Sequence, residues 1–189
     1  PVACLLLKPI PVLCVLAWVG QVPSRDARLV SLGLLLSLVG DVCLTSVVDL
    51  FIPGLVAFLL AHVAYVVAYV GRTRALHLAR LVPVAAFGAL AFTWLEPSLG
   101  EMRGPVLAYV VVICTMMWRA AAQIGERPGA EGHAWAALIG AVMFAVSDTM
   151  VAYNRFVAPS LGVEIALMIL YWGAQAMIAA SVERAGARR

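Results

Sequence analysis

Long apolar runs separated by short polar turns occupy the chain from one end to the other. A helix that crosses a bilayer needs roughly 20 mostly apolar residues. The sequence predicts seven such helices, at residues 2–21, 28–48, 51–71, 76–95, 104–123, 133–152 and 159–181. The expected fold is therefore an all-α, polytopic transmembrane helix bundle that forms a single domain over residues 1–189.

Turn-forming residues mark the predicted breaks between these helices. Because the loops are short, neighbouring helices should run antiparallel. The breaks are Pro23-Ser24-Arg25-Asp26, Ile52-Pro53-Gly54, Gly71-Arg72, Glu96-Pro97-Ser98, Arg127-Pro128-Gly129 and Ala158-Pro159-Ser160.

Arginines are distributed unevenly between the two predicted sides of the membrane. The side that carries the C-terminus has most of them, and the opposite loops carry only Arg103 and Arg155. The positive-inside rule then predicts a cytosolic C-terminus, in the plasma or inner membrane if the source is bacterial. The arginines on the C-terminal side are Arg25, Arg28, Arg72, Arg74, Arg80, Arg119, Arg127, Arg184, Arg188 and Arg189.

Composition agrees with a membrane location, since 64% of the residues are hydrophobic and 12% are charged. A soluble domain of this length needs more polar surface. No basic run alternates with aromatic residues, so we expect no nucleic-acid partner. The cysteines lack disulfide or metal-ligand spacing and are interpreted as small buried side chains: Cys4, Cys14, Cys43 and Cys114.

A short pattern occurs twice, as glycine, seven residues and aspartate. Gly33 precedes Asp41 in this way, and Gly140 precedes Asp148. Both helices run in the same direction, which predicts a parallel repeat with halves of approximately 1–75 and 76–189. One further helix before Pro1 would complete a four-plus-four protein of eight spans.

Four ionisable residues lie deep within the predicted spans: Lys8, Asp41, His62 and Asp148. Glu164 and Arg155 lie nearer the outer boundary. Charge inside a bilayer is costly and is usually functional. Counted from the cytosolic helix ends, Asp41, Asp148 and Lys8 lie at depths of about 20, 22 and 21 Å, and His62 at about 15 Å. We therefore expect the three charged groups to share one layer.

Polar side chains also form stripes that should meet inside the bundle. The stripes are Ser37, Asp41 and Thr45; Phe58, His62, Tyr65 and Tyr69; and Glu164, Met168, Tyr171 and Gln175.

Structural interpretations of the same residues remain open. Lys8 and an aspartate are able to form a purely structural ion pair, and His62 to join a hydrogen-bond network. The tyrosines are able to serve packing alone. Ser147 has no nucleophile elbow around it, and one intramembrane histidine makes a poor zinc site, so no serine triad or metal is expected.

Two aspartates in one layer favour acid–base chemistry. Neighbouring carboxylates resist joint ionisation, so one can hold a proton as the acid while the other stays charged as the base. Lys8 is suited to hold the charged one in its ionised state.

The pattern resembles the YhhN-like lysoplasmalogenases, and the likeness runs over nearly the whole chain. This resemblance implies an eight-span fold and, without a cofactor, hydrolysis of the vinyl ether bond of a lysophospholipid to a fatty aldehyde and glycerophospho-choline or -ethanolamine. It further implies Asp41 and Asp148 as the catalytic pair. The residues that carry it are Lys8-Pro9, Gly40-Asp41, Phe51, Gly54, Phe58, His62, Tyr65, Gly140, Phe144, Ser147-Asp148, Phe156, Tyr171 and Gln175.

The remaining polar residues are expected to support this chemistry. His62, Tyr65, Tyr171 and Gln175 would position water or the head group, and Arg155 would meet the phosphate. The main alternative is a small proton-coupled transporter or lipid carrier, since midplane charges and parallel repeats also occur there. A non-catalytic scaffold or sensor is the third option, although it has no need of two aspartates at one depth.

Overall fold

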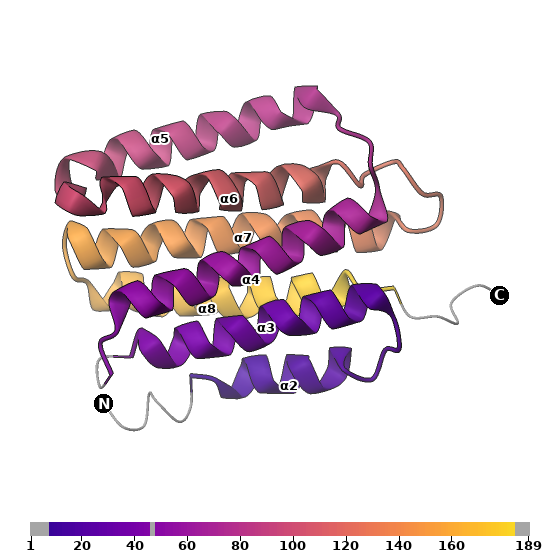
Figure 1. The fold of residues 1–189 in the computed structure, drawn as a ribbon, viewed down its shortest axis with the longest axis horizontal. Helices are drawn as coiled ribbons and strands as arrows, with labels where there is room; N and C mark the ends of the chain where they lie inside the picture. The colour runs from indigo at the N-terminus through magenta and orange to yellow at the C-terminus, as the bar shows by residue number, and fades with distance from the viewer. Residues whose placement is uncertain (1–7, 46–47, 184–189) are drawn as a thin grey trace.

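The structure is a computed structural model that describes residues 8–45 and 48–183. The described residues form an all-helical bundle (Figure 1). Predictions for Cys4, Arg184, Arg188, Arg189 and the first residues of the helix expected at 2–21 lie outside this part. The helices are α2 (Ile10–Val19), α3 (Arg25–Cys43), α4 (Phe51–Arg72), α5 (Leu81–Leu99), α6 (Arg103–Ala121), α7 (Glu131–Phe156) and α8 (Leu161–Ala180), with short 3₁₀ turns η1 (Leu78–Arg80) and η2 (Gly100–Met102).

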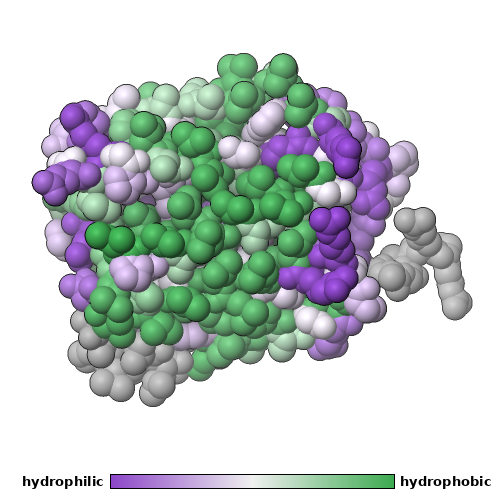
Figure 2. Space-filling view, in the orientation of Figure 1, coloured by the Kyte–Doolittle hydropathy of each residue, from purple (hydrophilic) through white to green (hydrophobic). Residues whose placement is uncertain are grey.

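Four segments of the described chain are long and apolar enough to cross a membrane. They are Phe51–Arg72, Leu78–Ala121, Glu131–Phe156 and Leu161–Ala180. The second comprises α5 and α6, which lie side by side and antiparallel (Figure 1). Figure 2 shows hydrophobic side chains over the middle of one face and hydrophilic ones at its two ends. These features are those of a multi-pass membrane protein.

Most of the helices follow one another around a closed ring. Going around it, α3 packs on α4, α4 on α6, α6 on α7 and α7 on α8, and α2 closes the gap between α8 and α3. The helix α5 lies outside this ring against α6 and α7. The buried core fills the interior, so polar groups on the inner faces are shielded from lipid and from water.

Helix ends follow from local sequence, with two corrections to the expected breaks. The break expected at Ile52-Pro53-Gly54 is wrong, because α4 already begins at Phe51. Pro53 lies in its first turn, where its missing N–H needs no partner. Pro97 lies inside α5, so the break expected at Glu96-Pro97-Ser98 is wrong. Pro97 has no N–H to donate to the carbonyl oxygen of Thr93, yet the helix continues for two more residues, and the chain reverses instead at Gly100, whose φ is +52°.

The two glycines of the repeated pattern both lie at close helix contacts. A Cβ at Gly33 would collide with the ring of Tyr65 on α4. A Cβ at Gly140 would lie 2.9 Å from the backbone nitrogen of Ile178 on α8. Each glycine thus lets an aspartate-bearing helix approach its neighbour closely, α3 to α4 and α7 to α8.

Candidate active site

One pocket of about 670 Å³, including its open mouth, lies toward the end of the bundle where α4 begins and α7 ends. Most of its wall is apolar, and the polar groups in it are few. The lining residues are Lys8, Asp41, Leu44, Phe51, Leu55, Phe58, Val106, Tyr109, Ser147, Asp148, Val151, Ala152, Phe156, Leu167, Met168 and Tyr171. An apolar pocket with a few convergent polar groups is the usual form of a small-molecule site.

Asp41 reaches the pocket from α3 and is 1% exposed. Its Oδ2 accepts a hydrogen bond of 2.6 Å from the Tyr171 hydroxyl on α8. The Lys8 Nζ lies 3.8 Å from its Oδ1. A carboxylate this deeply buried needs such partners, because burial of an unpaired charge is costly.

Asp148 reaches the same pocket from α7, with 15% of its side chain exposed. Its Oδ2 accepts a hydrogen bond of 2.5 Å from the Tyr109 hydroxyl and lies 3.5 Å from the His62 Nε2. The Nδ1 of His62 is 2.6 Å from the carbonyl oxygen of Phe58, which can only accept. Nδ1 therefore carries a proton, and the Nε2 of a neutral His62 is free to accept one from Asp148.

Aromatic rings hold these polar groups in place. The fully buried ring of Phe144 meets the His62 ring at 4.5 Å between centroids and the Tyr171 ring at 5.5 Å. The Phe58 ring packs edge-on against both Phe144 and Tyr171. Rigid aromatic packing of this kind restricts the rotamers of the groups that face the pocket.

The structure brings together four of the eight residues expected at the site: Lys8, Asp41, Asp148 and Tyr171 line the pocket. His62 lies behind Asp148. The other three lie elsewhere, and they are Tyr65, Gln175 and Arg155.

Tyr65 and Gln175 are buried away from the pocket wall. The Tyr65 hydroxyl donates a hydrogen bond of 2.9 Å to the Gln175 Oε1, and both side chains are 0% exposed. Neither side chain is therefore placed to contact a molecule bound in the pocket.

Arg155 lies near the mouth, paired with Asp49 at 3.1 Å. Its guanidinium is 5.0 Å from the ring centroid of Phe51, a lining residue. It is on the rim of the site and not inside it.

Sequence reasoning missed Tyr109, the donor to Asp148. The available signal is its depth. Tyr109 follows Arg103 by six residues, about 9 Å, and Asp148 precedes Phe156 by eight, about 12 Å, so both lie at a similar distance from the same end of the bundle. A hydroxyl at that depth in an otherwise apolar helix is a candidate partner for a buried carboxyl.

Ser147 lines the pocket, but its hydroxyl donates a hydrogen bond of 2.9 Å to the carbonyl oxygen of Leu167. No general base activates it, which disfavours a serine nucleophile. Within residues 8–45 and 48–183, no group of three or more potential metal ligands comes together. The chemistry that the described residues support is acid–base chemistry by two carboxyl groups.

Long apolar helices around an interior pocket with two carboxyl groups define a multi-pass membrane protein with a candidate acid–base site. The YhhN family model matches residues 4–182, and the chain belongs to the YhhN family.

Several similar proteins are named lysoplasmalogenase. The chain is 33% identical to human "Lysoplasmalogenase TMEM86B" over 95% of its own length and 75% of that protein. It is 31% identical to human "Lysoplasmalogenase TMEM86A" over 93% of the chain and 76% of the relative. It is also 32% identical to "Lysoplasmalogenase" of Mycobacterium bovis over 85% and 61% of the two lengths. No solved structure matches the chain.

Proposed function

We propose that this protein is a membrane lysoplasmalogenase, which hydrolyses the vinyl ether bond of a lysoplasmalogen to a fatty aldehyde and a glycerophospho-alcohol. The observation that carries the proposal is that Asp41 and Asp148, from different helices, line one apolar pocket. The names of the relatives agree with this activity.

Asp148 is the general acid in this proposal, and Asp41 is the base. The positive charge of Lys8 beside Asp41 favours its ionised form. Asp148 instead faces the accepting Nε2 of His62, and Tyr109 fixes the orientation of its carboxyl group. The acid is thus the aspartate that has no lysine beside it.

The reaction proceeds by protonation of carbon. Asp148 gives its proton to the β-carbon of the vinyl ether, and the positive charge moves to the α-carbon and its oxygen as an oxocarbenium ion. Asp41 stabilises this cation and takes a proton from the attacking water as its oxygen bonds to the α-carbon. The hemiacetal then collapses: its hydroxyl proton passes to the ionised Asp148 and the proton held by Asp41 passes to the glycerol oxygen, which restores both carboxyl groups to their starting states.

The pocket also suits the rest of the substrate. Leucine, valine and phenylalanine side chains in its wall match the alkenyl chain. Arg155 at the rim is placed to exchange Asp49 for the phosphate of the head group, because both partners are anions.

For the topology, we propose seven spans with the C-terminus in the cytosol, and a parallel repeat that pairs α3 and α4 with α7 and α8. The close glycine contacts of Gly33 and Gly140 support the repeat. The concentration of arginines at the end where α4 finishes and α7 starts supports the orientation.

The test is an assay of detergent-purified protein with a lysoplasmalogen, measuring free aldehyde. Release in the presence of a chelator supports the proposal, with the ester-linked lysolipid as the control for bond selectivity. No aldehyde, together with uptake of the lipid into proteoliposomes driven by a pH gradient, would overturn it in favour of a carrier.

A further inference from the structure

The mouth of the active-site pocket is bridged by side chains from the start of α4 and the end of α7. Phe51 is the first residue of α4 and Phe156 the last of α7, and both line the pocket. Their rings meet edge-on, with 5.4 Å between the centroids. Beside them, the Arg155 Nη1 donates to the Asp49 Oδ1 at 3.1 Å, and the guanidinium carbon lies 5.0 Å from the centroid of the Phe51 ring. We call these four residues the mouth latch.

The contacts of the mouth latch are of a kind that opens easily. The side chains of Arg155 and Asp49 are 46% and 66% exposed, and an ion pair in water contributes little to stability because water solvates both charges. Asp49 also has a φ of +44°, a left-handed backbone conformation that is strained for a residue with a side chain. A competing partner for Arg155 is therefore able to open the latch.

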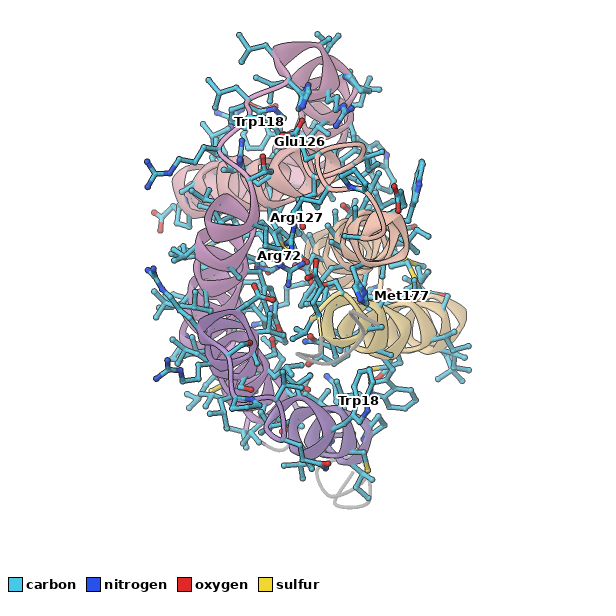
Figure 3. The ribbon with its side chains drawn as sticks, turned by 90° about the vertical axis from the view of Figure 1, so that its right-hand side faces the viewer. Trp18, Arg72, Trp118, Glu126, Arg127 and Met177 are labelled. Atoms are coloured by element: carbon cyan, nitrogen blue, oxygen red, sulfur yellow. The ribbon has the colours of Figure 1, made fainter. Side chains whose placement is uncertain are left out.

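The opposite end of the bundle is fastened more firmly. Figure 3 looks onto that end, where Arg72, Glu126 and Arg127 lie near one another between the helices. The mostly buried Arg72 at the end of α4 donates to Asp26 on α3 and, at 2.9 Å, to Ser181 just beyond α8. Opening there would break several partly buried hydrogen bonds at once. Opening at the mouth latch breaks one exposed ion pair and separates one pair of rings.

A phosphate group is a suitable competitor for Arg155. It is an anion with several accepting oxygens, so it can take the place of the Asp49 carboxylate on the guanidinium. Arg155 follows Asp148 by seven residues on α7, about 10 Å along the helix axis. The glycerol backbone between vinyl ether and phosphate, together with the arginine side chain, spans this separation. A head group held by Arg155 thus leaves the vinyl ether near Asp148.

We propose that the mouth latch selects vinyl ether lipids that carry a phosphate head group. This role of Asp49 and Phe51 rests on the proposed function. When the phosphate binds Arg155, the contacts of the guanidinium with Asp49 and Phe51 are lost, and the rings of Phe51 and Phe156 separate to admit the alkenyl chain. A ligand shifts such an equilibrium only by binding the open form more tightly than the closed one. A lipid without an anion gains nothing at Arg155, so it is admitted less often.

Two substrates with the same alkenyl chain test the latch: a choline lysoplasmalogen, and the 1-alkenylglycerol that has a hydroxyl in place of the phosphate ester. The readout is kcat/KM for aldehyde release in detergent. Asp49→Asn is the main variant, because asparagine tolerates the left-handed backbone and lacks the charge that holds Arg155. We expect it to raise kcat/KM for the neutral lipid about fivefold and to change the value for the lysoplasmalogen by less than about twofold.

Two further variants and a control sharpen the test. Phe51→Leu and Arg155→Gln each remove a latch contact, so both should also raise kcat/KM for the neutral lipid, although Arg155→Gln weakens binding of the lysoplasmalogen. A gain on the neutral lipid is not expected if Arg155 only contacts the phosphate. The matched control is Glu96→Gln, which removes an ion pair with Arg103 at the same end of the bundle. Neither Glu96 nor Arg103 lines the pocket, so both kcat/KM values should equal wild type.

Two results would overturn the latch. One is an unchanged kcat/KM for the neutral lipid in Asp49→Asn and Arg155→Gln, which would leave Arg155 as a simple phosphate ligand. The other is a rise in Glu96→Gln as large as in the latch variants, which would assign the gain to general loosening of this end. Failure of the proposed function itself looks different, because wild-type protein would then release no aldehyde from the lysoplasmalogen.

Discussion

The two ends of the bundle hold their charges in different ways. At the end where α4 finishes and α7 starts, Arg72 forms a two-pronged pair with Asp26 at 2.9 Å, and Arg127 meets Glu183 at 2.8 Å. In the candidate active site the cationic partner of Asp41 is 3.8 Å away, and the nitrogen that faces Asp148 is 3.5 Å away. Close ion pairing satisfies a charge and stabilises the fold. In the candidate active site the short contacts come from tyrosine hydroxyls and the nitrogens stay farther away, an arrangement that leaves the carboxyl groups able to exchange protons.

The largest effect is expected when this chemistry is removed. Asp41→Asn or Asp148→Asn should lower aldehyde release by about a thousandfold or more, because an amide of the same shape neither gives nor takes the proton. The amide oxygen still accepts from Tyr171 or Tyr109, so the midpoint of thermal unfolding should change little. Activity retained in both variants would remove the mechanism.

A substitution at the opposite end should show the reverse profile. Arg119 is 3% exposed, and its guanidinium donates to the carbonyl oxygens of Ala75 at 2.8 Å and Thr73 at 2.5 Å. Arg119→Met should lower the free energy of unfolding by about 3 kcal/mol, since two carbonyls lose a charged donor. Thermal unfolding in detergent measures this loss, and aldehyde release per folded molecule should equal wild type. A large loss of activity in folded Arg119→Met would contradict the separation of the two ends.

The spacing of apolar residues and the high free energy of burying a charge in a membrane predicted much of this arrangement. The apolar runs predicted the helices, because a bilayer demands their length. The depth of Lys8, Asp41 and Asp148 predicted a shared layer, and these residues do line one pocket. Burial of Ser37 and Asp41 along one face of α3, and of Thr45 just beyond its end, was also expected from their spacing.

Tertiary contacts decided what the sequence pattern left open. Tyr109 became a partner of Asp148 only because α6 and α7 pack together at that level. Arg155 was expected to meet a phosphate, but it has an anionic partner within reach, Asp49, that lies far away in the sequence. Side-chain spacing within one helix carries no information about such pairs.

The rim of the pocket offers an intermediate effect. Arg155→Gln should raise the KM for the lysolipid about fivefold with kcat nearly unchanged, because an exposed charge pair contributes about 1 kcal/mol to binding. The matched control is Asp49→Asn, which frees Arg155 and should leave KM equal or lower. An unchanged KM in Arg155→Gln would show that the phosphate lies elsewhere.

The smallest effect concerns Glu126, in the loop between α6 and α7. Hydrogen bonds from His77 and Thr73 hold the pKa of Glu126 below its usual value of 4.5. A carboxyl group whose pKa is lower in the folded protein than in the unfolded chain stabilises the folded protein at any pH above its pKa in the unfolded chain. This stabilisation is lost as the pH falls through the pKa of the group in the folded protein. Wild type should therefore unfold at a slightly higher temperature than Glu126→Gln at neutral pH, and the difference should shrink below about pH 4.5. A difference that stays constant across this range would show that the charge of the Glu126 carboxylate does not contribute to stability, and that only its hydrogen bonds matter at this end of the bundle.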